Sequence, residues 1–290
     1  MYKGPAGIHH RALLVYLRYC CMIPFLFAAF ILFMFGLAIG SFLNVVIYRM
    51  VHGDSALRGR SYCDACKKPI AWYDNIPLFS FLILKRKCRH CKTLIPWEYP
   101  AVEMLTGALF VWWYVVGFTF FQLTSQPLGF IQPLFWLCVG ILFLVITFTD
   151  ISYMIIPDSA VVLLTIASIA YRLYLTQTGV MQVKDLGISL ATALLCSLFF
   201  FALVLITKGR GMGFGDVKLV FPLGLILGFP NSLVALFVAC VSGAIVGMIL
   251  IWRKDKKLSG IIPFGPFLIF GSIVALVWGD KLMKWYLSFL

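Results

Sequence analysis

The chain has 290 residues, of which 62% are hydrophobic and only 12% are charged, and its mean hydropathy is +0.99. A water-soluble domain carries about twice that charged fraction, so the composition excludes a soluble globule and indicates a membrane protein. The net charge of +13 does not require nucleic acid as a partner, because membrane topology and attraction to anionic lipid account for it.

Long apolar runs recur along the chain, and a run of about 20 residues is enough for a helix to cross the bilayer. We therefore expect an all-α polytopic membrane protein with about eight transmembrane helices, the sixth of them short. The runs lie near residues 22–48, 101–120, 130–149, 159–176, 187–207, 217–229, 232–252 and 263–280.

The first run follows Lys3, Arg11 and Arg18 and could be mistaken for a secretory signal. The apolar part of a signal is only about 7 to 15 residues long, whereas this run continues to Tyr48 without a cleavage pattern before it. We interpret it as a retained helix.

Lysine and arginine are concentrated in three segments, 49–100, 207–218 and 253–257, which hold 17 of the 24 such residues. All three segments fall on the same side of an eight-helix arrangement. The positive-inside bias makes that side cytoplasmic and places both termini outside.

The basic stretch 49–100 is the part with a water-soluble composition, and it holds two C-x2-C pairs separated by 21 residues. Two such pairs can bind one tetrahedral Zn²⁺ through four thiolates and close a small domain that has little core. Two disulfides are the alternative, which a reducing cytoplasm disfavours. Neither pair is followed by glycine, which would ease the tight turn. The expected ligands are Cys63, Cys66, Cys88 and Cys91, in a small cytoplasmic zinc-binding domain between helices 1 and 2.

Four acidic residues lie within or at the edges of the apolar runs: Glu103, Asp150, Asp158 and Asp216. An ionisable group is costly there, so each is a candidate functional residue. Asp158 and Asp216 could instead cap the helices that they begin. Asp150 ends its helix, where a negative charge opposes the helix dipole and caps nothing, so it is the hardest to explain structurally.

Two aspartates from different helices at one level of the membrane are the minimum requirement for aspartic proteolysis. Because two close carboxylates do not both ionise, one retains a proton while the other deprotonates the attacking water. Asp150 and Asp216 both fall at the cytoplasmic face. Glycines 211, 213 and 215 would let an extended substrate backbone approach Asp216.

Several motifs resemble those of known peptidases. "GMGFGDVK" (211–218) resembles the G-x-G-D motif of intramembrane aspartic proteases, and "TFTDISYMIIPD" (147–158) resembles its partner in bacterial prepilin leader peptidases. The similarity includes "GSFLNVVIYR" (40–49), the cysteine pairs and "IPFGPFL" (262–268), in the family's order.

This resemblance implies that Asp150 and Asp216 are the catalytic pair and that the substrates are precursors of type IV pilins or pseudopilins, cut at the cytoplasmic face. Family members with the four cysteines usually also methylate the new N-terminal amine with S-adenosylmethionine. The residues that would bind this methyl donor are not identifiable from the sequence. The expected partners are therefore prepilins and membrane lipid, not nucleic acid.

Two other classes of function fit parts of the sequence. Intramembrane acids also line the pathways of ion-coupled transporters, and a tetracysteine domain can serve as a membrane-anchored interaction module. A transporter would have acids near mid-bilayer and internal repeats, whereas these acids lie near one face.

We expect three domains: a first helix at 1–48, the tetracysteine domain at 49–100 and a seven-helix membrane peptidase domain at 101–290.

Overall fold

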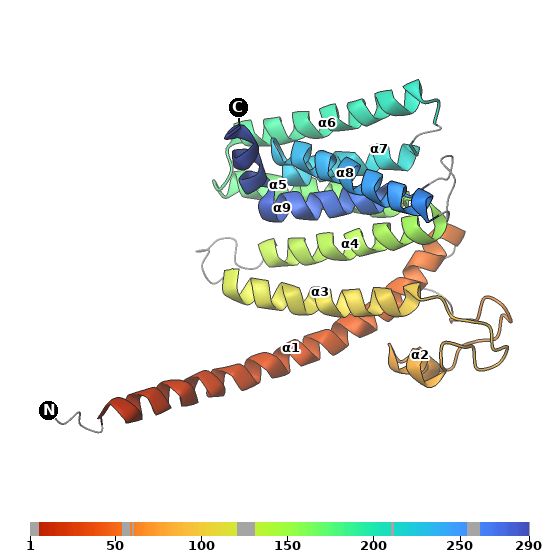
Figure 1. The fold of residues 1–290 in the computed structure, drawn as a ribbon, viewed down its shortest axis with the longest axis vertical. Helices are drawn as coiled ribbons and strands as arrows, with labels where there is room; N and C mark the ends of the chain where they lie inside the picture. The colour runs from red at the N-terminus through yellow and green to blue at the C-terminus, as the bar shows by residue number, and fades with distance from the viewer. Residues whose placement is uncertain are drawn as a thin grey trace. The chain divides into compact units, whose positions relative to one another are not determined.

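The computed structural model describes residues 6–53, 59, 61–120, 131–209, 212–253 and 262–289, with side chains from residue 24 onward and without those of 117–120. In this part the secondary structure is helical (Figure 1). The only β-type pairings within it are two isolated bridges. The elements are α1 (Ala6–His52), the 3₁₀ helix η1 (Trp72–Asn75), α2 (Phe79–Ile83), α3 (Glu98–Phe120), α4 (Ile131–Tyr153), α5 (Asp158–Gln177), α6 (Val183–Ile206), α7 (Phe214–Leu227), α8 (Asn231–Trp252) and α9 (Gly265–Leu287).

Every expected apolar run forms a helix, so the prediction of an all-α polytopic membrane protein is confirmed. Within the described residues, seven helices are long and apolar enough to cross a membrane, α1 doing so with its part Pro24–His52. The expected sixth segment forms α7, whose 14 residues extend about 21 Å, less than the roughly 30 Å of the hydrocarbon core.

The chain divides into two compact units. One comprises Met1–Asn44 and Arg60–Gly129, and the other comprises Val45–Gly59 and Phe130–Leu290. The first contains most of α1, the tetracysteine segment and α3, and the second contains α4 to α9. The predicted division into three domains by composition remains a prediction.

In the first unit, glycines bring α1 and α3 into close contact. A Cβ added to Gly36 would lie 2.8 Å from the Gly107 Cα, and one added to Gly40 would lie 2.6 Å from the Glu103 Cα. Such distances leave no room for a side chain. Small residues four apart are typical of membrane helices whose backbones approach closely, because packing rather than the hydrophobic effect holds such helices together.

We expect Gly40→Ala to destabilise this pairing, since the new methyl group would overlap the backbone of α3. Overpacking of this kind costs about 1–3 kcal/mol, and thermal unfolding in detergent would measure it as a lower Tm. Gly187→Ala on α6 is the matched control, because a Cβ there meets nothing within 4 Å. Equal Tm values for the two variants would contradict the proposed close packing.

In the second unit, α7 is enclosed by its neighbours. It packs against α5, α6, α8 and α9, while α4 packs on α5 and α9 (Figure 1). Most of its side chains are buried, and a Cβ on Gly224 would lie 2.7 Å from the Ala193 Cα of α6. The core of this unit is built around Ile146, Leu164, Phe200, Leu219 and Leu268.

The end of α7 is closed by an arginine from α5. Arg172 donates from Nε to the Leu225 carbonyl at 2.8 Å and from Nη2 to the Ile226 carbonyl at 2.9 Å. The last carbonyls of a helix have no partner within the helix and must find one elsewhere. Arg172 therefore caps the C-terminal end of α7. The residue was not singled out from the sequence, because its partners lie more than 50 positions away.

Candidate active site

Asp150 lies in the last turn of α4 and is only 5% exposed. Its Oδ2 accepts a hydrogen bond of 2.9 Å from the Gly265 N–H, at the first residue of α9. A helix N-terminus carries a partial positive charge, so α9 supplies the favourable interaction that the end of α4 does not. This contact explains how a carboxylate is tolerated where its own helix opposes it.

Asp216 is the third residue of α7 and is 6% exposed. Its Oδ2 accepts the Gly213 N–H at 3.3 Å, so the carboxylate closes the first turn of α7. The capping role considered for Asp216 is thus present. It does not exclude another role, because one carboxylate has further lone pairs to offer.

The two carboxylates are brought together around Ile156, which follows α4. A Cβ on Gly265 would lie 3.4 Å from the Ile156 Cδ1 and 2.6 Å from Asp150 Oδ2, and a Cβ on Gly215 would lie 3.1 Å from the Ile156 Cβ. The turns that carry Gly215 and Gly265 therefore converge on one isoleucine. Asp150 and Asp216 therefore both lie next to glycines that face this isoleucine.

The glycines before Asp216 differ from the expectation that they leave space for a substrate. The face of Gly215 is occupied by Ile156, so this glycine serves packing between α7 and the segment after α4. Gly213 has only the Asp216 carboxylate and the Gly215 backbone near it. Gly211 lies outside the described residues.

Asp158 does not cap α5. The cap position is Pro157, and no side-chain cap bond forms there. Instead, Asp158 Oδ1 accepts a 2.8 Å hydrogen bond from Lys218 Nζ, which joins the start of α5 to α7 two residues after Asp216. The pair is largely solvent-exposed, so its contribution to stability is small.

Glu103 has a structural partner in the first unit. Its Oε2 accepts the Leu78 N–H at 2.8 Å, which ties the loop before α2 to α3. This bond accounts for a buried carboxylate in a membrane helix without requiring catalysis.

The four candidate ligand cysteines form one cluster. All four Sγ atoms lie within 4.8 Å of one another, and Cys63 and Cys91 are 3.7 Å apart. A tetrahedral zinc site with Zn–S bonds of about 2.3 Å requires S···S distances of about 3.8 Å. The arrangement therefore fits one shared metal ion better than two separate disulfides.

The two cysteine turns have the same backbone. Cys63 and Cys88 accept hydrogen bonds from the N–H groups of Lys67 and Lys92, at 2.7 and 3.1 Å. Both lysines have positive φ, of 55° and 62°. They occupy the position after the second cysteine, where the sequence lacks the expected glycine, so the turn forms at some cost in backbone strain.

The cysteines of the cluster differ in the pKa of their thiols. The hydrogen bond with Thr93 lowers the pKa of Cys91 to about 6, whereas burial raises the pKa of Cys63 to about 11. Because the thiol of Cys63 keeps its proton at neutral pH, all four cysteines would be thiolates together only with a bound cation.

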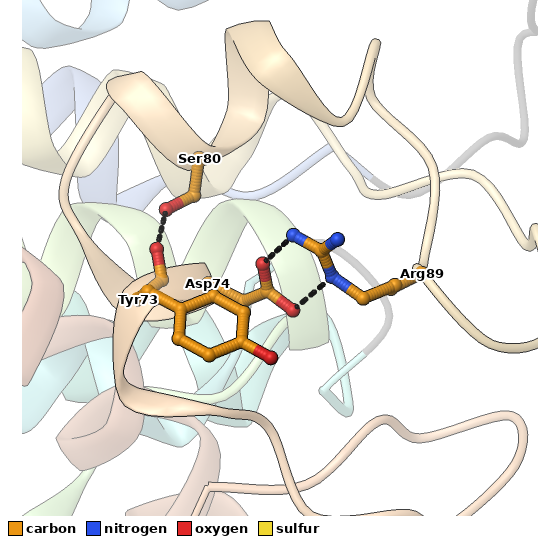
Figure 2. Close-up of polar contacts among 4 residues, drawn as sticks. All are labelled: Tyr73, Asp74, Ser80 and Arg89. Carbon is orange, nitrogen blue, oxygen red and sulfur yellow. Dashed lines mark hydrogen bonds and ion pairs between the residues drawn. The ribbon is translucent and has the colours of Figure 1, made fainter.

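Arg89, between Cys88 and Cys91, fixes this cluster to η1. Figure 2 shows its guanidinium binding Asp74 through two hydrogen bonds, from Nε at 2.8 Å and Nη2 at 2.5 Å, while Ser80 donates to the Tyr73 carbonyl. The hydrogen bond from Arg89 lowers the pKa of Asp74, so this pair stays ionised at neutral pH. The contact weakens only when acid protonates Asp74.

Comparison with known proteins assigns the family. The model described as the bacterial peptidase A24 N-terminal domain matches residues 34–116, and that of the type IV leader peptidase family matches 136–248. A protein of Aeromonas salmonicida named prepilin leader peptidase/N-methyltransferase is 34% identical, over 92% of this chain and 96% of its own length. The chain belongs to the type IV leader peptidase family.

Members with the same name in Legionella pneumophila and Bacillus subtilis are 31% and 32% identical, over 88% and 89% of this chain and 93% and 97% of their own lengths. No solved structure matches. The region matched by the leader peptidase model contains Asp150 and Asp216, and the N-terminal model contains the cysteine cluster and Glu103. Gly265 lies beyond both regions.

The names of these family members imply a methyl donor, and the size and lining of one cavity can be compared with it. It lies between α6, α7, α8 and α9, has a volume of about 10 Å³ and offers Ser232 and Ser272 as its only polar side chains beside the Cys196 thiol. S-adenosylmethionine is far larger and carries several charges. This cavity does not fit it.

We expect Gly265→Ala to reduce peptidase activity about a hundredfold, because the new Cβ would displace the carboxylate of Asp150, the candidate catalytic residue, by up to about one ångström. Cleavage of a synthetic prepilin would measure the loss. Gly247→Ala is the matched control, since a Cβ there meets only Ile262 at 3.7 Å. Unchanged activity in Gly265→Ala would show that the contact with α9 does not position Asp150.

Proposed function

We propose that this protein is a membrane aspartic endopeptidase that removes the leader of type IV prepilins or pseudopilins at the cytoplasmic face of the bacterial inner membrane. It would also N-methylate the new N-terminal residue with S-adenosylmethionine. The observation that carries the peptidase is the convergence of two buried aspartates, Asp150 and Asp216, from two helices of a family member. The match to the family gives no support to an ion-coupled transporter or to a passive interaction module.

The hydrogen bonds favour a division of labour between the two acids. Asp150 accepts a short N–H bond from Gly265 and faces the N-terminus of α9, and both interactions stabilise its ionised form. Asp216 accepts a longer bond from Gly213. We therefore assign Asp150 as the general base and Asp216 as the proton donor.

In the first step, Asp150 takes a proton from water while the oxygen attacks the scissile carbonyl carbon. Asp216 donates its proton to the carbonyl oxygen, which avoids a free oxyanion in a site of low polarity. In the second step, the C–N bond breaks, the amine leaves with the proton held by Asp150, and Asp216 recovers its own proton from the collapsing intermediate. The pair returns to its starting state.

The cysteine cluster has a separate role in this proposal. One structural Zn²⁺ would be held by the four cysteines Cys63, Cys66, Cys88 and Cys91. When bound, the metal would cross-link the two cysteine turns. Four protein ligands leave no coordination position open for a substrate. The site therefore stabilises the domain and takes no part in hydrolysis.

The distribution of charge supports the orientation. The segments 49–100, 207–218 and 253–257 hold most of the lysines and arginines, so we place them in the cytoplasm. Asp150, at the end of α4, and Asp216, at the start of α7, then lie toward the cytoplasmic side.

The test is to incubate the purified protein with a synthetic prepilin, with and without S-adenosylmethionine, and to weigh the products. We expect loss of the leader in both reactions and the added mass of one methylene on the mature peptide only with the donor. Folded, metal-loaded protein that cuts none of several prepilins would contradict the assignment.

A pre-cut pilin separates the two reactions. If methyl transfer uses a second site, Asp216→Asn protein should methylate a pilin that already lacks its leader, although it cannot cut the precursor. Failure to methylate in a variant with an unchanged Tm would contradict the two-site arrangement.

A further inference from the structure

The short helix α2 presents one apolar face to the outside of the protein. Phe79, Leu82 and Ile83 lie at positions i, i+3 and i+4, which share one side of a helix, and they are 53%, 71% and 74% exposed. Ser80, which lies beside this face, is buried and bonded to the Tyr73 carbonyl (Figure 2). The polar residue thus points inward and the apolar residues point outward.

This exposure belongs to a fixed backbone. The N–H of Leu78, directly before α2, is held by Glu103, and the preceding η1 is held by the bonds from Arg89 to Asp74. With these contacts in place, α2 cannot turn its apolar face inward without breaking them. An exposed apolar face on a backbone that is held in place indicates a contact surface.

The same contacts set the depth of α2. Glu103 lies five residues after Glu98, the first residue of α3, which is about 8 Å along the axis of a membrane helix. Its bond to Leu78 therefore holds the start of α2 beside the first turns of α3. Trp97, which precedes α3, is 62% exposed, and its ring lies 5.1 Å from that of Phe81 in α2. Tryptophan is enriched at the membrane interface, so α2 lies at the level of the lipid headgroups.

Cations follow the apolar face immediately. Lys85 and Lys87 are exposed, and the Arg86 guanidinium lies 5.0 Å from the centre of the Trp97 ring. Apolar side chains next to lysines and an interfacial tryptophan are the composition that binds the boundary between headgroups and acyl chains of an anionic bilayer.

We propose that α2 is an interfacial anchor of the tetracysteine domain: Phe79, Leu82 and Ile83 insert into the membrane surface, and Lys85 and Lys87 bind anionic phospholipid headgroups. The occupant of this face is lipid, because its depth is fixed relative to α3 and because apolar and cationic groups occur together. A prepilin docked on the same face is an outcome that the test distinguishes.

The test places the photo-crosslinking residue p-benzoylphenylalanine at Phe79 of the full-length protein in nanodiscs of phosphatidylcholine with phosphatidylglycerol. After illumination, mass spectrometry should find a phospholipid adduct on the peptide that contains residue 79. The yield should fall about tenfold with Lys85→Gln/Lys87→Gln and stay unchanged with the control pair Lys281→Gln/Lys284→Gln, two exposed lysines of α9. It should also fall when phosphatidylglycerol is omitted.

Absence of a lipid adduct, or a prepilin adduct that replaces it when prepilin is added, would overturn the proposal. The wild-type protein supplies a second measurement that needs no substitution. Amide hydrogen exchange in residues 79–87 should be slower in nanodiscs with phosphatidylglycerol than in those without it, while residues 61–70 exchange equally. Equal exchange of 79–87 in both bilayers would also refute the anchor.

Discussion

Replacing either Asp150 or Asp216 by asparagine should abolish leader cleavage, with a fall in kcat/KM of about 10⁴-fold. A single carboxyl group cannot both deprotonate the water and protonate the carbonyl oxygen, and an amide does neither at neutral pH. Both hydrogen bonds to the chain can still form through the asparagine carbonyl, so we expect the fold to survive. Mass spectrometry of a synthetic prepilin would measure cleavage, and thermal unfolding would measure the fold.

Asp158→Asn is the control for this prediction. Asp158 is a nearby acid on a neighbouring helix, but it is exposed and bonded to Lys218 rather than to the pair. The Asp158→Asn variant should retain most of the peptidase activity. Full cleavage by Asp150→Asn or Asp216→Asn would show that these residues are not the catalytic acids.

Replacing Cys63 or Cys88 by serine should remove the bound metal and lower the amount of folded protein before it affects the chemistry. Four-cysteine zinc sites contribute about 10–16 kcal/mol of apparent binding energy in small domains, so the loss of one ligand exceeds the effect of an ordinary core substitution. Elemental analysis should find about one zinc per chain in the wild-type protein and little in the variants. Acidification should release the metal, because protons compete for the thiolates.

Cys240→Ser is the matched control. This cysteine lies on α8, is exposed and is not part of the cluster. The substitution should leave the zinc content and yield unchanged. Wild-type protein without zinc would refute the metal assignment even if the four thiols are close together.

The features that the sequence predicted are those with a local signal. Apolar runs predicted the helices because the bilayer demands about 20 consecutive apolar residues, whatever lies next to them. The cysteine pairs predicted the cluster because their spacing alone favours a shared metal. Asp150 stood out because its position conflicts with the dipole of its own helix.

The contacts that the sequence could not predict join residues far apart in the chain. Gly265, which donates to Asp150, lies 115 residues later, and Lys218, which binds Asp158, lies 60 residues later. Asp158 directly follows Pro157 at the start of a helix, so the local pattern predicted a helix cap. In the folded protein its carboxylate binds Lys218 instead. Gly215 likewise could be read as space for a substrate until the fold placed Ile156 against it.

With Asp216 as the proposed catalytic acid, the shortness of α7 would determine where hydrolysis takes place relative to the lipid. Three residues separate the end of α7 from the start of α8, which is about 33 Å long, enough for a whole crossing. In the proposed orientation, the end of α7 and the start of α8 therefore both lie at the outer surface. The shortfall of about 9 Å between α7 and the hydrocarbon core then falls at its other end, which carries Asp216. On this proposal the peptide bond would be cut below the headgroup level, and the enzyme would have to admit water to a depth that the surrounding bilayer keeps dry.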